Sequence, residues 1–196
     1  MDPARALGDL AAGDLDIGAA GHRRQPAAAK GGNVAEDPLE VRARALWSAL
    51  VSQLRSTRLG HESLSQVRLA AKLGVAVNTL FRWESQREFP TAARLESWCC
   101  ALGLSLTLVE RPGVEAGRPG GALNGRTGGT LSGLVAALRQ AREQRQITQA
   151  WLASALGLAR SSIRRWEDGS TSPRPLALMK WAILLNCTLQ LVPASD

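Results

Sequence analysis

Few side chains in this sequence have types and spacings that could support catalysis or metal binding. The chain has three cysteines, Cys99, Cys100 and Cys187, and two histidines, His22 and His61. Their spacing matches neither a zinc site nor a secreted disulfide framework, so we expect the cysteines to be buried small hydrophobic residues in a reducing compartment. The sequence has no phosphate-loop motif and no Ser/His/Asp or Cys/His arrangement. It therefore predicts neither an enzyme nor a protein with a metal or organic cofactor.

The chemistry that the sequence offers in quantity is positive charge, mostly from arginine. The 196 residues carry a formal net charge of +7. Residues 41–109 contribute +5 and residues 131–196 contribute +4, whereas residues 1–40 carry −3. Two basic segments of this kind favour a polyanionic partner such as a nucleic acid.

The two basic segments are copies of one unit. Residues 147–192 overlie residues 64–109 after a shift of 83 positions, and 16 of the 46 aligned residues are identical. Two unrelated sequences of average composition would share roughly three. We call residues 37–110 the first repeat and residues 130–196 the second repeat, and their lengths predict two small cores rather than one large core.

The segments outside the repeats have a different composition. Residues 1–36 are rich in Ala, Gly and Asp and have no periodic apolar face, so we expect a disordered tail. Residues 111–129 are rich in Gly and Pro. A flexible linker of that length has a reach of roughly 25 Å, which lets the repeats lie side by side.

Each repeat contains two short predicted helices joined by a tight turn. In the second repeat, Leu152, Ala153 and Leu156 recur at helical spacing, and Gly157 gives the backbone freedom that a reversal needs. A second helix is expected from about residue 159 to residue 167. Two short helices with such a turn form a helix-turn-helix. The inward residues expected in the first repeat are Leu69, Ala70, Leu73, Leu80 and Trp83.

A first helix precedes each helix-turn-helix, and a last helix and a strand follow it. The first helix of the first repeat is expected to run from Asp37-Pro38 to about Arg58 and to bury Leu46, Leu50 and Leu54. The last helices carry tryptophans on an apolar stripe, which favours core packing over a stacking platform for single-stranded nucleic acid.

Residues 104–109 and 187–192 alternate apolar and polar side chains, as half-buried strands do. Isolated strands are unstable in water, so we expect these two to pair in antiparallel fashion within one chain. The fold class predicted is therefore mainly α. It consists of two tandem helix-turn-helix domains of four to five helices each, each ending in a short β-strand, with the strands paired in a small antiparallel sheet.

Both repeats resemble the Cro/CI-type helix-turn-helix family, also called the xenobiotic-response-element type. The shared pattern is a Ser-Gln or Thr-Gln start at 65–66 and 148–149, a Leu-Ala pair, Leu-Gly followed by a hydrophobic residue, Trp-Glu, then Pro and a leucine stripe. The final strands resemble those of HipB-type antitoxins, whose dimers join such strands into a two-stranded sheet. The resemblance covers about two thirds of the chain.

The resemblance implies roles for residues of each recognition helix, the second helix of the motif. The family's base-reading positions correspond here to Val77, Asn78, Arg82, Arg160, Ser161 and Arg165. Its phosphate contacts are expected from Gln66, Thr79, Arg87, Gln149, Ser162 and Arg164. The valine has no hydrogen-bond donor, so at that position the first repeat reads a thymine methyl group or nothing.

The resemblance also implies an ion pair between the first helix and the recognition helix. The family's arginine and glutamate fall on Arg142 and Glu167 in the second repeat. In the first repeat they fall on Arg58 and Glu84, where the arginine is shifted by one residue because this repeat has one extra residue before its Ser-Gln. The repeats differ after the recognition helix, where the family often has glycine. The second repeat has Gly169 and the first has Gln86.

These features predict a cytoplasmic, nucleoid-associated transcription regulator of bacterial or mobile-element origin that binds double-stranded DNA through two non-identical helix-turn-helix domains. The alternative is an antitoxin-like module that neutralises a protein partner and regulates its own operon. Trp151 lies at an outward position, which favours either a protein contact or a partly buried surface residue. We expect no membrane association, because no apolar run is long enough.

Overall fold

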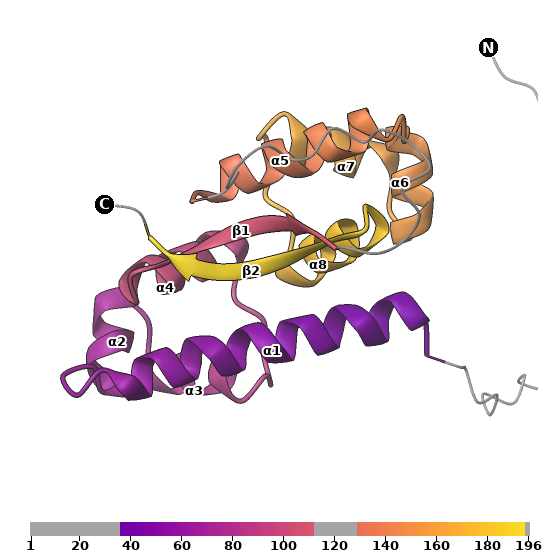
Figure 1. The fold of residues 1–196 in the computed structure, drawn as a ribbon. Helices are drawn as coiled ribbons and strands as arrows, with labels where there is room; N and C mark the ends of the chain where they lie inside the picture. Colours follow the sequence, from indigo (N-terminus) through magenta and orange to yellow (C-terminus); the bar gives the residue numbers. More distant parts are fainter. Residues whose placement is uncertain (1–35, 112–128, 195–196) are drawn as a thin grey trace, which may run out of the picture. The chain divides into compact units, whose positions relative to one another are not determined.

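The computed structural model describes residues 36–111 and 129–194, and the expected tail lies outside these residues, as does nearly all of the expected linker. Each repeat forms four helices and a strand in the same order (Figure 1). The first repeat contains α1 (Pro38–Gly60), α2 (Gln66–Leu73), α3 (Val77–Glu84), α4 (Ala92–Ala101) and β1 (Leu104–Glu110). The second repeat contains α5 (Leu131–Gln144), α6 (Gln149–Leu156), α7 (Arg160–Glu167), α8 (Pro175–Leu184) and β2 (Cys187–Pro193). The predicted fold class is confirmed.

Local sequence signals begin and end the helices of the motif. The side chain of Ser65 accepts a hydrogen bond from the Arg68 N–H and begins α2, and Thr148 does the same for α6 through the Trp151 N–H. Gly74 and Gly157 follow these helices in the left-handed conformation, with φ values of 63° and 66°. The tight turn expected from the sequence is therefore present in both repeats.

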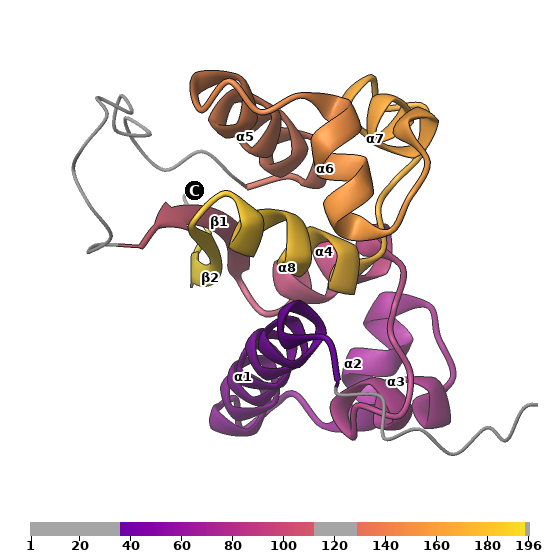
Figure 2. The ribbon, with the colours of Figure 1, turned by 90° about the vertical axis from the view of Figure 1, so that its right-hand side faces the viewer.

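The two strands pair in antiparallel fashion within the chain, as predicted. Figures 1 and 2 show this ribbon with the helix-turn-helix of the first repeat on one side and that of the second on the other. The first helix of each repeat crosses to the other repeat, since α1 packs on α8 and β2, and α5 packs on β1 and α4. The α1–α8 contact is the more extensive of the two helix pairs.

Because the first helix of each repeat packs on the other repeat, the two repeats share one continuous hydrophobic core. The sequence predicted two small cores. The prediction was wrong because each repeat has one strand with no partner of its own, and the apolar faces of that strand and of the last helix are covered by the other repeat. Trp98 and Trp181 are fully buried, and their rings lie 5.9 Å from Trp83 and 6.2 Å from Trp166, respectively. Trp83, Trp98 and Trp181 therefore belong to the core, and Trp166 packs against it.

Two burial predictions need correction. Leu46 is only half-buried, because Trp47 and Val51 lie on the buried face of α1 instead. Cys99 and Cys187 are buried as expected, but Cys100 is exposed. One residue along α4 turns the side chain by about 100°, which carries Cys100 away from the core.

Ion pairs also join the repeats. Arg145 at the end of α5 donates to Glu110 at the end of β1 over 2.5 Å. Lys180 on α8 pairs with Glu40 on α1, and Arg44 donates to the same carboxylate over 2.9 Å. Charged contacts therefore support the apolar contacts between repeats at both sites.

Candidate nucleic-acid interface

The recognition helices α3 and α7 are held by equivalent networks in the two repeats. Arg58 on α1 donates two hydrogen bonds to Glu84 at the end of α3, over 2.6 and 2.8 Å. The Gln66 side chain, at the start of α2, donates to the same carboxylate over 3.0 Å. Three helices therefore meet at one buried carboxylate.

In the second repeat, Arg142 on α5 donates to Glu167 over 2.7 and 2.9 Å, and Gln149 on α6 donates over 2.8 Å. A further guanidinium N–H of Arg142 donates to the carbonyl of Ile147 over 2.8 Å. Both ion pairs have the bidentate geometry that fixes orientation as well as distance. Each recognition helix is thus fixed to the first helix and to the start of the preceding helix.

The networks also fix the two glutamines expected at phosphates. Each amide N–H₂ group of Gln66 and Gln149 already donates to a glutamate. Both side chains are half-buried, in contrast to the exposed arginines of α7. A phosphate contact at these positions would use the second N–H of the amide or the backbone N–H groups at the start of the helix.

Helices α3 and α7 have no side-chain cap at their N-termini. They follow Ala76 and Ala159, whose side chains make no hydrogen bond to the helix. The backbone N–H groups of the first helical turn therefore lack the cap that begins α2 and α6, and an acceptor on DNA can take that place. Thr79 and Ser162, expected at phosphates, lie half-buried in these first turns.

The outward face of α7 is strongly basic. Arg160, Arg164 and Arg165 are exposed, and none of them forms an ion pair with another of the described residues. Ser161 is exposed beside them. Hydrogen bonding to Ser170 holds the pKa of Asp168 below its usual range, and the arginines add a smaller effect. The structure therefore leaves four of the predicted contact residues of α7, Arg160, Ser161, Arg164 and Arg165, exposed, and Ser162 half-buried.

The equivalent face of α3 has a different character. Val77 and Asn78 are exposed at its start, and Phe81, equivalent to Arg164, is 44% exposed on the same face. The guanidinium of Arg87 lies 5.7 Å from the centre of the Phe81 ring. Arg82 lies 3.7 Å from the carboxylate of Glu88, an exposed and therefore weak pair. The first repeat thus presents an apolar strip flanked by two arginines.

Phe81 was not singled out from the sequence. The signal that could have found it is its spacing, since it lies four residues after Val77 on the outward face, at the position where the second repeat has arginine. A large apolar side chain at an exposed helical position is a reason to look for a contact there.

Comparison with known proteins supports this description. A family model described as helix-turn-helix matches residues 54–109 and 138–192, which together make up more than half of the chain. No curated protein and no solved structure matches the chain. Two helix-turn-helix units with exposed recognition helices define a DNA-binding transcription regulator. The chain belongs to the Cro/CI-type helix-turn-helix family and carries two tandem copies of its domain.

The family is a regulatory one and not an enzymatic one. Among residues 36–111 and 129–194, no cluster of three or more His, Cys, Asp or Glu side chains could hold a metal ion. None of the described helices combines the length and the apolar character that crossing a membrane requires.

Proposed function

We propose that one chain reads an imperfect palindrome in double-stranded DNA as a single-chain pseudo-dimer, with residues 37–110 and 130–196 as its two reading units. The observation that carries this proposal is the register of the sheet. Thr107 on β1 pairs with Gln190 on β2, which is its own equivalent in the repeat. A contact between equivalent residues is what a two-fold axis produces.

The remaining pairs of the sheet are reciprocal about that contact. Leu106 pairs with Leu191 and Leu108 pairs with Leu189, whereas the repeat makes Leu106 equivalent to Leu189 and Leu108 equivalent to Leu191. This reciprocal register supports a two-fold relation between the two repeats, like that between the subunits of a dimer. Such an arrangement favours recognition helices in successive major grooves, with half-sites about 34 Å apart.

The two half-sites would differ because the two recognition faces differ. Arg160 and Arg165 can each address guanine with two hydrogen bonds, so the second repeat favours a G·C-rich half-site. Asn78 suits adenine, Arg82 suits guanine, and Val77 with Phe81 offers apolar contact to thymine methyl groups. The first repeat therefore favours a half-site richer in A·T. Arg87, Arg164 and the first turns of α3 and α7 would contact phosphates.

Selection from random double-stranded DNA tests this proposal. The expected result is an imperfect palindrome whose two halves lie one helical turn apart and are bound by one chain, with stoichiometry measured by mass photometry. Enrichment of a perfect palindrome bound by two chains would contradict the pseudo-dimer. Failure to enrich any sequence would contradict DNA reading itself.

A protein partner is the second candidate, in the manner of an antitoxin. It is favoured by Trp151, whose side chain is 51% exposed on α6, and by the apolar strip on α3. On this alternative, Trp151→Ala abolishes association with the product of an adjacent gene and leaves DNA affinity unchanged. Loss of DNA affinity in that variant would instead place Trp151 at the DNA.

A further inference from the structure

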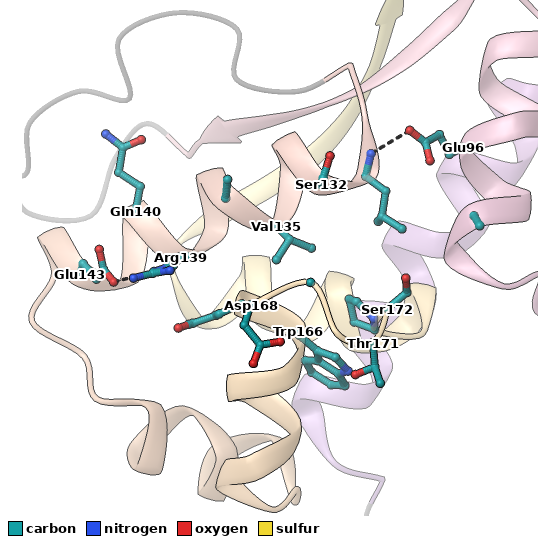
Figure 3. Close-up of a pocket in the computed structure, with 16 residues that line it drawn as sticks. Glu96, Ser132, Val135, Arg139, Gln140, Glu143, Trp166, Asp168, Thr171 and Ser172 are labelled. Carbon is teal, nitrogen blue, oxygen red and sulfur yellow. Dashed lines mark hydrogen bonds and ion pairs between the residues drawn. The ribbon is translucent and has the colours of Figure 1, made fainter.

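A groove of about 710 Å³ lies beside the recognition helix of the second repeat. One wall is the outer face of α5, the other is the segment from Trp166 to Pro173 that follows α7, and Ala93 and Glu96 of α4 close one end. Figure 3 shows Val135 on the α5 wall and Trp166 on the opposite wall. The volume lies within the usual range for small-molecule sites, roughly 300 to 1,000 Å³.

The first repeat fills the same place with its own side chains. Trp47 on α1 and Phe89 before α4 pack with their ring centres 5.2 Å apart. Gln86 donates to the hydroxyl of Ser48, the residue after Trp47, over 3.0 Å. The equivalents of the tryptophan, the phenylalanine and the glutamine in the second repeat are Leu131, Ser172 and Gly169. The groove is therefore a position from which two aromatic rings and an amide are missing.

The side chains around the groove are acidic, on a protein whose net charge is +7. Glu96, Glu143, Glu167 and Asp168 line it, against a single lining arginine, Arg139. Glu167 is neutralised by Arg142, and Glu143 is paired with Arg139 over 2.9 Å.

The remaining two carboxylates have no cation paired with them among the described residues. Glu96 accepts the Leu131 N–H over 2.9 Å, and Asp168 accepts the Ser170 N–H over 2.9 Å. In the view of Figure 3, Glu96 lies at one end of the groove and Asp168 lies towards the other. The acidic lining disfavours phosphate groups at this place, whereas the basic face of α7 favours them.

We infer that this groove is a binding site for an organic cation with an aromatic body, whose rings occupy the place that Trp47 and Phe89 occupy in the first repeat. Val135, Trp166 and the stem of Arg139 would cover the rings, and the carboxylates of Glu96 and Asp168 would attract the positive charge from the two sides of the groove. A cation held there touches Trp166, Glu167 and Asp168 at the end of α7, so its binding changes DNA affinity. That last consequence rests on the function proposed above.

Binding is tested first without DNA, on the full chain, with tetraphenylphosphonium as the probe and isothermal titration calorimetry as the measurement. Tetraphenylborate has the same shape and the opposite charge. The expected result is saturable binding of one tetraphenylphosphonium per chain, at least tenfold tighter than binding of tetraphenylborate. Equal affinity for the two ions, or no binding of tetraphenylphosphonium, overturns the assignment.

Two variants locate the site. Leu131→Trp combined with Ser172→Phe fills the groove as the first repeat does and should abolish binding. Glu96→Gln combined with Asp168→Asn keeps the shape and should weaken binding at least fivefold. Glu62→Gln combined with Glu88→Gln removes two carboxylates away from the groove and should leave binding unchanged. Circular dichroism checks that each variant folds, and unchanged affinity in the neutralised variant overturns the site even where the filled variant misfolds.

The effect of the cation on DNA binding is measured with the operator that the selection from random DNA enriches. Tetraphenylphosphonium should change DNA affinity of the parent at least threefold and should leave that of the filled variant unchanged. Equal DNA affinity of the parent with and without the cation overturns the coupling. Saturable cation binding by a protein that enriches no DNA leaves the groove assigned and contradicts the proposed function, whereas DNA reading without cation binding contradicts the groove alone.

Discussion

Gln86 and Gly169 occupy equivalent positions after the two recognition helices, and both adopt the left-handed backbone conformation, with φ values of 58° and 77°. The first repeat therefore keeps the turn of the family without its glycine. A non-glycine residue in this conformation costs about 1 kcal/mol or more, and the hydrogen bond from Gln86 to Ser48 offsets part of that cost.

Substitutions at these two positions should have opposite effects on stability. Gln86→Gly relieves the strain and is expected to raise the free energy of unfolding by up to about 1 kcal/mol. Gly169→Ala should lower it by about 1 kcal/mol, although a Cβ at that position would meet no atom within 4 Å. Chemical denaturation measures both changes. A loss of stability in Gln86→Gly would show that the side-chain hydrogen bond outweighs the backbone strain.

The buried pair in the second repeat should be essential for stability. Glu167→Ala leaves the guanidinium of Arg142 buried, 7% exposed, with its main partner removed, and is expected to cost about 3 kcal/mol or more. Glu84→Ala should have a similar effect through Arg58, whereas Glu88→Ala removes only an exposed pair and serves as the control. Thermal melting of the three variants gives the comparison. A melting temperature of Glu167→Ala equal to that of the control would mean that the pair contributes little.

Arg165→Ala tests base reading by the second repeat. The variant should lose about 1 to 3 kcal/mol of binding free energy on the selected operator and should relax specificity only in the G·C-rich half. Repeated selection with the variant measures both effects. A uniform loss across all sequences, with a smaller dependence on salt, would instead assign Arg165 to a phosphate.

Phe81→Ser tests the apolar contact that we propose for the first repeat. Replacing thymine by uracil in the DNA removes the methyl group and leaves the base pair intact. The parent should bind the operator with uracil in the A·T-rich half more weakly, and Phe81→Ser should lose less affinity on the same replacement, because only the Val77 contact remains. If both proteins lose the same affinity on uracil substitution, Phe81 does not contact the methyl groups.

The contact between α1 and α8 should depend on pH through Glu40. A hydrogen bond from Lys180 is the largest effect on this carboxyl and holds its pKa below the usual value of 4.5. Because the folded pKa is lowered, the stabilisation is complete above pH 4.5 and is lost as the pH falls through the folded pKa. Glu40→Gln should therefore be less stable than the parent at pH 7 and equal to it at pH 2. A constant difference across this range would exclude the ionised pair as its source.

Much of the fold could be predicted from the sequence because the repeat keeps a constant spacing from residues 64–109 to residues 147–192. Helical periodicity identified the inward residues, such as Leu80 and Trp83, and alternation identified the strands. Periodicity defines which face is apolar and not which element covers it. The packing of α1 on α8, and hence the single core, could not be predicted for that reason.

The limits of sequence reasoning at the site are of the same kind. Motif spacing placed the residues of α3 and α7 on the correct helices. It could not show that Gln66 and Gln149 are held by glutamates, since those contacts join segments 18 residues apart. The groove was not predicted either, because it arises from what Leu131, Gly169 and Ser172 lack relative to the first repeat.

The pairing of β1 with β2 inside one chain has a consequence for dose response. A regulator that assembles from two separate subunits is scarce in its active form when the protein is dilute, so its operator occupancy initially rises with the square of the protein concentration. In the pseudo-dimer that we propose, the second half is supplied by the same molecule at a fixed effective concentration. Operator occupancy would then rise in direct proportion to protein concentration, giving a graded response where an assembling dimer gives a threshold.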